Sequence, residues 1–400
     1  MNPLASASIV VAVSGGIAAY KAADLVSSLT QAGARVEVIL TRGAREFIRP
    51  LTFQALTHRP VHEDLFEPWT EASLGHVSLA RDTALLIVAP ASANTIARLA
   101  LGMADDLLGA VALATGAPIL VAPAMEHHMY HHPATRGHLT TLRGWGVTVI
   151  GPASGRLASG ETGDGRLAGV PEIIGAARQV LGRGGPLAGR RIVVTAGGTR
   201  EPLDPVRYLT NGSSGLMGYA IARAAIDVGA TVSLISTPVV LPAVVGAEMV
   251  HVGTALEMAT AVDEQTARAD VLVMAAAVAD FRPATAAAHK VKKQGGTATM
   301  TLDLVLNPDI LAGLDRPGLI KVGFAAETDD LVANARAKLD AKGLAMIVAN
   351  DARDAIGSPD NEVVLLTPGA EPEYVPRMDK DDLAAILIAR VGTLLAGNRP

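Results

Sequence analysis

The chain has 400 residues, of which half are apolar and only 18% are charged, with a formal net charge of −5. This composition excludes a disordered chain, and the near balance of 34 basic and 39 acidic residues argues against a general nucleic-acid binder. The absence of cysteine excludes disulfides, thiolate catalysis and cysteine-ligated zinc. At roughly 150 residues per domain, the length predicts two or three domains.

The amino-terminal segment does not have the pattern expected of a secretory signal. It reads MNPLASASIVVAVSGG, without the basic region and long apolar stretch of a secretory signal. Apolar runs elsewhere end early in Gly, Pro, Ser or Asn, well short of the roughly 18 residues of a membrane-spanning helix. We therefore expect a soluble, cytoplasmic protein with neither membrane nor nucleic acid as a partner.

Short apolar runs alternate with helical patterns in the first half of the chain. A strand is predicted over residues 8–13; it stops at Ser14, and a helical pattern begins at Ile17. Further strands are predicted over residues 36–40, 85–89, 119–122 and 147–150, followed by a helix over 171–181. Continuous apolar strands separated by helices indicate a parallel sheet covered on both faces.

The alternation of strands and helices begins again after a glycine-rich segment, residues 182–189. This segment lacks apolar periodicity and is the predicted linker. Later strands are predicted over residues 191–196, 232–236, 271–276, 321–325 and 345–349, and helices over 217–228 and 379–395. The sequence thus predicts two doubly wound, Rossmann-like α/β domains, residues 1–181 and 190–400.

Both predicted domains place glycines directly after their first strand. In a doubly wound sheet this is the carboxyl edge, where ligands bind, and the following helix N-terminus favours anions such as phosphate. Neither VSGGIA, residues 13–18, nor TAGGTR, residues 195–200, fits the G-x-G-x-x-G dinucleotide pattern. A nicotinamide-dependent dehydrogenase is therefore an alternative without support from this motif.

Several ordered segments of the first half resemble the flavin-dependent cysteine decarboxylases, which bind FMN. They are SGGIAAYK (14–21), TRGA (41–44), HVSLA (76–80), APASANT (89–95), GMADDL (102–107) and APAM (122–125). The resemblance implies a flavodoxin-like domain that acts on 4′-phosphopantothenoylcysteine. FMN oxidises its thiol to a thioaldehyde, carbon dioxide departs, and the electrons return to give 4′-phosphopantetheine.

The same resemblance assigns roles to individual residues. His76 becomes the base of the oxidative half-reaction, whereas its position alone, after a glycine and before a predicted strand, is typical of a surface loop histidine. The residues implied in cofactor binding follow the predicted strand ends, where small, hydroxyl and amide side chains can meet phosphate, ribityl or ring atoms. They are Ser14, Gly15, Gly16, Ile17, Thr41, Ser92, Asn94, Met125 and Glu126.

Two positions depart from the pattern of this family. Glu126 stands where asparagine is usual, and Ser159, in the flap of residues 155–165, stands at the position of a cysteine that donates a proton in the final reduction. Because a hydroxyl is a far weaker acid than a thiol, either another group supplies the proton or this half is impaired. An actinobacteria-like branch of the family also lacks both residues, which favours retained decarboxylation.

The segment from Glu126 to His132 has a second possible interpretation. Histidines four residues apart on a helix can bind a metal ion, as His127 with His131 or His128 with His132. Pro133 would end such a helix, and no further ligand cluster is visible in the sequence. A polar, solvent-facing loop is therefore the favoured interpretation.

The second half resembles phosphopantothenate–cysteine ligase over a long ordered stretch. The matching segments are 195–207, 211–215, 217–218, 275–283, 290–293, 307–310 and 323–328, and Leu216 stands where lysine is usual. The resemblance implies that CTP activates phosphopantothenate as an acyl-cytidylate with release of pyrophosphate, and that the amine of cysteine then forms the amide. Such a site needs cations to balance the triphosphate.

Particular residues are implied in that chemistry. Asp280 is the candidate Mg²⁺ carboxylate, and Asn211 is the candidate catalytic residue that binds the acyl-cytidylate. Lys338 and Lys342 would instead be an exposed helix face, and Phe324 core, if judged in isolation. The residues expected to bind CTP are Met274, Ala275, Ala276, Asp280, Lys290, Asn307, Pro308, Asp309, Ile310, Phe324, Lys338 and Lys342.

The two resemblances together imply a bifunctional enzyme of coenzyme A biosynthesis with small-molecule substrates. Members of the family associate through both halves, which implies trimeric contacts at the flavin domains and dimeric contacts at the ligase domains, giving a dodecamer. Two alternatives stay open: a ligase whose first half binds flavin but decarboxylates poorly, and a non-catalytic flavoprotein that regulates a larger assembly.

Overall fold

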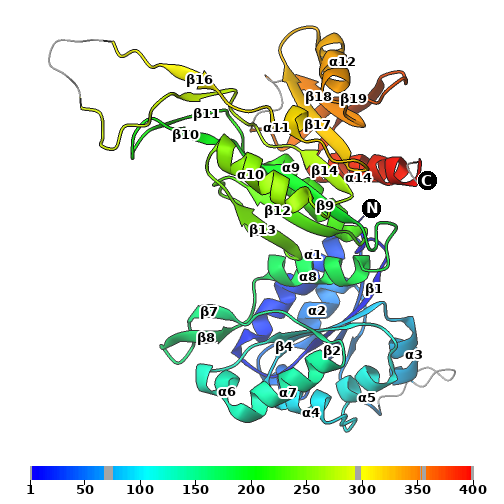
Figure 1. Cartoon of the computed structure of the whole chain (residues 1–400). Helices are drawn as coiled ribbons and strands as arrows, with labels where there is room; N and C mark the ends of the chain where they lie inside the picture. The colour runs from blue at the N-terminus through cyan, green and yellow to red at the C-terminus, as the bar shows by residue number, and fades with distance from the viewer. Residues whose placement is uncertain (1, 67–74, 293–298, 352, 354–356, 398–400) are drawn as a thin grey trace. The chain divides into compact units, whose positions relative to one another are not determined.

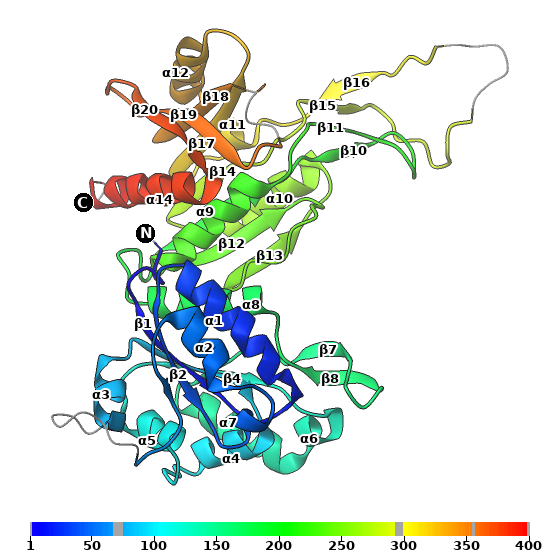
Figure 2. The same cartoon turned by 180° about the vertical axis from the view of Figure 1, so that it is seen from behind.

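The computed structural model describes residues 2–66, 75–292, 299–351, 353 and 357–397 (Figures 1 and 2). The chain divides into two compact units, residues 2–182 and residues 183 onwards. Each unit has its own sheet, wholly parallel in the first unit and parallel except for its last two strands in the second. None of the helices in these described ranges is both long and apolar enough to cross a membrane.

The first unit is built on a six-stranded sheet in the order β3-β2-β1-β4-β5-β6. Every pairing is parallel. The chain order reverses between β1 and β4, so the carboxyl ends of these two strands form the crevice where doubly wound sheets bind ligands. The strands are β1 (Ser8–Val13), β2 (Arg35–Leu40), β3 (Val61–His62), β4 (Leu85–Ala91), β5 (Ile119–Pro123) and β6 (Thr148–Val149).

Helices cover both faces of this sheet (Figures 1 and 2). Helices α1, α2 and α8 pack as one layer, and α3, α4, α5 and α7 pack as the other. The all-apolar strands fit this arrangement, since β4 is buried along its whole length. The helices are η1 (Ile17–Tyr20), α1 (Lys21–Gln31), η2 (Ala44–Glu46), α2 (Pro50–Thr57), α3 (Gly75–Asp82), α4 (Ala93–Ala100), α5 (Leu107–Ala114), α6 (His127–His131), α7 (Pro133–Gly144) and α8 (Val170–Gly182).

An antiparallel hairpin follows this sheet, formed by β7 (Ala153–Arg156) and β8 (Thr162–Arg166). It contains most of the segment expected to be the flap. The main chain joins it to the end of β5, because the amide of Met125 donates to the carbonyl of Gly165 at 2.9 Å. The sequence pattern did not predict these strands, since their glycines and polar residues carry no apolar alternation.

The second unit has an eight-stranded sheet in the order β13-β12-β9-β14-β17-β18-β19-β20. Its pairings are parallel as far as β18, and β19 and β20 add antiparallel. The strands are β9 (Arg191–Ala196), β12 (Thr231–Ser236), β13 (Ala247–His251), β14 (Val271–Met274), β17 (Ile320–Glu327), β18 (Met346–Asp351), β19 (Asp360–Leu366) and β20 (Glu373–Asp379). The chain order again reverses at the first strand of the unit, between β9 and β14.

Two hydrophobic layers hold this sheet. Ile192 and Val194 point to the face covered by α9 and α14, and Val193 points to the face covered by α10 and α12. The helices are α9 (Leu216–Asp227), α10 (Ala255–Thr266), α11 (Ile310–Gly313), α12 (Leu331–Ala341) and α14 (Lys380–Gly397).

Two antiparallel ribbons extend from the carboxyl edge of this second sheet (Figure 1). They are β10 (Arg200–Pro202) with β11 (Tyr208–Thr210), and β15 (Phe281–Pro283) with β16 (Leu304–Leu306). The strand predicted over 271–276 ends earlier, at Met274. Asp280 therefore lies at the end of the connection between β14 and β15.

Candidate functional site

In the first unit, hydrogen bonds join the ends of the two strands that flank the topological switch. Ser14 is buried; its Oγ donates to the carbonyl of Pro90 at 2.8 Å and accepts from the amide of Ser92 at 2.8 Å. Ser92 in turn caps α4 by accepting from the amide of Thr95. The structure therefore brings together the loops after β1 and β4, in which Ser14 and Ser92 are expected to bind a cofactor.

Close backbone approach explains why glycine follows Ser14. A Cβ atom on Gly15 would lie 2.7 Å from the carbonyl carbon of Gly43, so no larger residue fits there. Thr41, after β2, bonds to the same region, since its Oγ1 donates to the carbonyl of Val13 at 3.2 Å. Open space surrounds Gly16, directly before η1. This leaves a cradle of backbone at the carboxyl ends of β1 and β2.

The remaining predicted cofactor residues follow β1, β4 and β5. Ile17 and Asn94 are exposed at the first turns of η1 and α4. Met125 is partly buried against the core of this unit, and Glu126 is the N-cap of α6, where its Oε2 accepts from the amide of His128 at 2.7 Å. The other oxygen, Oε1, is buried and has no hydrogen-bond partner among the described residues.

Two sequence interpretations in this unit change, those of His76 and of the histidine-rich segment, whereas Ser159 lies within the segment expected to be the flap. His76 lies in the first turn of α3, not in a loop before a strand, and it is not joined to Ser14 or Ser92 by any described hydrogen bond. Ser159 lies exposed in the turn between β7 and β8. Residues His127–His131 form the short helix α6 rather than a loop, because Glu126 caps its start. As the sequence predicts, this helix ends before Pro133, which begins the separate helix α7.

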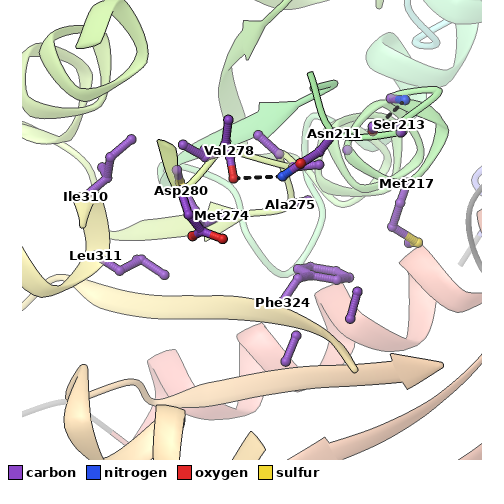
Figure 3. A pocket seen from close by; sticks show the side chains of 18 of the residues that line it. Asn211, Ser213, Met217, Met274, Ala275, Val278, Asp280, Ile310, Leu311 and Phe324 are labelled. Carbon is purple, nitrogen blue, oxygen red and sulfur yellow. Dashed lines mark hydrogen bonds between the residues drawn. The ribbon is translucent and has the colours of Figure 1, made fainter. Parts of the chain in front are cut away.

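In the second unit, one pocket of about 780 Å³ occupies the carboxyl edge of the sheet (Figure 3). It lies beyond the ends of β9, β14 and β17, where the chain order reverses. Every predicted CTP residue except Lys290 lines it, together with Asn211. These residues are Met274, Ala275, Ala276, Asp280, Asn307, Pro308, Asp309, Ile310, Phe324, Lys338 and Lys342.

Side-chain amides tie the loops around this pocket together. Asn211 donates through Nδ2 to the carbonyl of Val278 at 3.0 Å, a bond drawn in Figure 3. Asn307 donates through Nδ2 to the carbonyl of Ala279 at 2.8 Å, and its backbone amide donates to the carbonyl of Asp280 at 2.8 Å. These bonds hold the segment after β14 between two loops that are far away in sequence.

Lys338 in α12 and Lys342 at the C-cap of α12 both reach the pocket, and each is paired with a carboxylate. Nζ of Lys338 lies 2.5 Å from Glu327 Oε1, and Nζ of Lys342 lies 2.9 Å from Asp309 Oδ2. Partial burial alone would raise the pKa of Asp309, but Lys342 and the amide of Ala312 together hold that pKa below its ordinary value. Asp309 is therefore ionised at neutral pH. Lys338 is exposed, as its helix position alone predicts, and both lysines also line the pocket.

The other predicted residues divide between the pocket and its surroundings. The Asp280 carboxylate is exposed at the pocket, and the ring of Phe324 is half-buried in its wall (Figure 3). Lys290 is exposed and is not among the lining residues. Leu216 opens α9 and lines the pocket, so an apolar side chain stands where a family lysine is expected.

The structure adds lining residues that the sequence interpretation missed. Asn361 and Lys380 come from the antiparallel strand β19 and from the start of α14. Both are buried, and Lys380 donates through Nζ to the carbonyl of Ser358 at 2.5 Å. Burial lowers the pKa of Lys380, although Asp360 opposes that shift. No sequence signal marks these positions, since β19 was itself not predicted.

Comparisons with known proteins match both halves of the chain. Residues 2–182 match the family model described as Flavoprotein. Residues 187–394 match the model described as DNA/pantothenate metabolism flavoprotein C-terminal domain. The two matches leave the short segment between them, residues 183–186, outside either model.

Relatives extend the similarity over the full length. The chain is 44% identical to the coenzyme A biosynthesis bifunctional protein CoaBC of Vibrio vulnificus, covering 99% of this chain and all of that protein. It is also 44% identical to the protein of the same name from Bacillus subtilis, covering 96% of this chain and 97% of that one. A crystal structure of the C-terminal domain of a CoaBC protein is 36% identical and covers 53% of this chain and 98% of that chain, with a TM-score of 0.46. The chain therefore belongs to the family of bifunctional coenzyme A biosynthesis proteins.

Proposed function

We propose that the second unit joins 4′-phosphopantothenate to cysteine at the expense of CTP, and that the first unit decarboxylates the product with FMN. The observation that carries the ligase half is the pocket at the switch edge of the second sheet, lined by Asn211, Asp280, Lys338 and Lys342. Its volume of about 780 Å³ accommodates a nucleotide beside a second substrate.

The residues of this pocket supply the groups that carboxylate activation needs. An acid reacts with an amine only after one of its oxygens becomes part of a good leaving group. Lys338 and Lys342 would bind the triphosphate and stabilise the charge that develops as pyrophosphate leaves. Asp280 offers the oxygen ligand that Mg²⁺ prefers, and the amide of Asn211 would hydrogen-bond the acyl-cytidylate.

The first unit fits FMN on two observations. Its strand ends form a backbone cradle at Gly15 and Gly16, followed by the first turn of η1, which suits a phosphate. In addition, the buried Glu126 Oε1 lacks a donor among the described residues, and a flavin ring carries an amide N–H. Bound flavin would supply the oxidation and reduction, while the protein orients the substrate and moves protons.

His76 would accept the proton in the oxidative half, and the β7–β8 hairpin would cover the substrate. The hairpin presents Ser159, at the position where a thiol is usual, and Glu161 in its exposed turn. A carboxylic acid is a far better proton donor than a serine hydroxyl. The competing candidate, a ligase with an impaired first half, rests on the same Ser159 and on Glu126.

Assembly through both halves is part of the proposal. Large apolar side chains are exposed around the carboxyl edge of the first sheet, which supports a protein–protein contact beside the flavin site. They are Ile17, Tyr20, Phe47 and Leu51. Mass photometry of the full chain would show a dodecamer; a monomer at micromolar concentration would contradict this.

The decisive experiment uses the FMN-loaded full chain with 4′-phosphopantothenate, cysteine, CTP and Mg²⁺. We expect pyrophosphate, 4′-phosphopantothenoylcysteine and then 4′-phosphopantetheine by mass spectrometry. Amide without carbon dioxide release would select the impaired-decarboxylase alternative. No cysteine-dependent pyrophosphate release would refute the ligase and favour a non-catalytic flavoprotein.

A further inference from the structure

Two histidines and one carboxylate meet where α6 faces the β7–β8 hairpin (Figure 1), and neither proposed reaction uses them. His127 and His131 lie four residues apart on α6, with ring centroids 4.4 Å apart. Asp164 faces them from β8, and one ligand atom of each of the three residues lies within 4.8 Å of the others. We propose that these three side chains bind a divalent transition-metal ion of the zinc type.

The separations suit such an ion. Two ligands held about 2.0–2.1 Å from zinc at the tetrahedral angle are about 3.4 Å apart. Nε2 of His131 lies 3.3 Å from Oδ2 of Asp164, which is nearly that spacing. Nδ1 of His127 accepts from the amide of Asp164 at 3.1 Å, so its lone pair is unprotonated and directed at β8. Metal binding would use this lone pair in place of that hydrogen bond.

Neighbouring residues orient the ligands. Ser154 Oγ donates to Oδ1 of Asp164, which fixes the carboxylate and leaves Oδ2 towards His131. Gly163 lets the imidazole of His127 lie directly against β8, because a Cβ there would be 2.6 Å from Nδ1. Outer hydrogen bonds of this kind position metal ligands and strengthen their binding. The cluster therefore has both ligands and support.

The ligand set selects the ion. Imidazole nitrogens favour Zn²⁺, Ni²⁺ and Cu²⁺, whereas Mg²⁺ prefers oxygen, so the ion would differ from the Mg²⁺ proposed for the ligase pocket. His131 is exposed, which leaves room for water at the fourth position and makes the ion exchangeable. Because the ligands come from α6 and β8, the ion would hold the hairpin that carries Ser159 and Glu161 against α6.

The test is a calorimetric titration of the untagged, EDTA-treated and dialysed full chain with ZnCl₂ in excess Mg²⁺. We expect one Zn²⁺ per chain at this site, and a Kd at least about tenfold weaker in His131→Gln and in Asp164→Asn, since each loses a ligand. His138→Gln, in α7 and outside the cluster, is the matched control and should bind within about twofold of the wild type.

A second cluster gives the experiment a further control. Glu126, His128 and Glu161 also bring ligand atoms within 4.8 Å of one another. His128→Gln should leave Zn²⁺ binding unchanged, and Zn²⁺ should slow hydrogen exchange of residues 157–163 in the wild type but not in His131→Gln. The proposal is overturned by absence of Zn²⁺ binding, by equal affinity in His131→Gln, by loss of binding in His128→Gln alone, or by unchanged exchange.

Discussion

Lys342 offers the sharpest test of the ligase site, because a structural role and a role in CTP binding predict different effects of its removal on stability and on kinetics. As a purely structural cation it would only pair with Asp309, at 2.9 Å and with side chains 28% and 47% exposed. Partly exposed ion pairs of this kind contribute about 0.2–1 kcal/mol to stability. Lys342→Met should therefore lower the free energy of unfolding by no more than about 1 kcal/mol.

As a triphosphate ligand, Lys342 would contribute much more to the reaction. A hydrogen bond to a charged group is worth about 1.5–3 kcal/mol. At 1.36 kcal/mol per factor of ten, its loss should reduce kcat/KM for CTP by about ten- to 150-fold. Lys342→Arg keeps the charge and should recover most of that loss. The assay is CTP-dependent pyrophosphate release at saturating cysteine and phosphopantothenate, with urea denaturation in parallel.

Arg336 is a matched control on the same helix. Its guanidinium donates to the carbonyls of Thr367 and Ala370, away from the pocket, at 2.9 Å each. Arg336→Met should show the reverse pattern, a stability loss of about 1–3 kcal/mol with an unchanged KM for CTP. If Lys342→Met costs stability but leaves kcat/KM for CTP unaltered, the assignment of Lys342 to the nucleotide is refuted.

Three further outcomes are expected. Ser14→Ala removes a buried hydroxyl that satisfies two backbone groups and should cost about 1–3 kcal/mol in urea denaturation, with weaker retention of FMN on dialysis. Gly218→Ala places a Cβ 2.6 Å from that of Ala196 and should cost about 1–3 kcal/mol, whereas Gly313→Ala, with open space around it, should not. Arg207 holds the pKa of the buried Asp204 carboxyl well below its usual range, so this pair stabilises the fold at neutral pH and loses that contribution as pH falls below about 4. The melting temperature of Asp204→Asn should therefore depend less on pH between about 5 and 3 than that of the wild type, and parallel curves would contradict this.

The parallel strands and the helices between them were predictable because their buried positions form recognisable apolar patterns in the sequence. β1 and β9 are continuous apolar runs that stop at glycine-containing loops, and both were predicted with the bounds observed. The final helix was predicted from its apolar periodicity, within two residues of the observed α14. The edge strand β6 is shorter than predicted, because apolar residues at an edge need not pair along their whole length.

Antiparallel elements escaped prediction for a physical reason. The hairpin β7–β8 is made of Gly, Ser, Thr, Asp and Arg, and neither of its faces packs on a core large enough to impose alternation. His76 was misread for a related reason: the first turn of α3 begins with Gly75, which reads as a loop. The burial of Lys380 was invisible, since it depends on where β19 and α14 meet.

The proposed metal site could not be predicted from the sequence for the same reason, since one of its ligands lies on the unpredicted hairpin. The spacing of His127 and His131 is visible in the sequence, but two imidazoles alone do not make a site, and their helix ends before Pro133 after only five residues. The third ligand comes from Asp164, thirty-three residues beyond His131, on a strand that the pattern did not predict. A feature that looks like a polar loop in one dimension thus becomes a candidate metal site once the hairpin folds back.

The residues that line the ligase pocket also divide into those whose position follows from the strand order and those placed by helix packing. Residues that follow β14 and β17 converge because carboxyl ends of parallel strands share one edge, so their meeting follows from the topology alone. Lys338 and Lys342 reach that edge only because α12 packs on β17 and β18 with its last turn beside Asp309. The lysines are therefore positioned by helix packing and by their carboxylate partners. A triphosphate bound as proposed would compete with those partners for the two ammonium groups, so we expect the affinity for CTP to depend on the packing of α12 as well as on its charges.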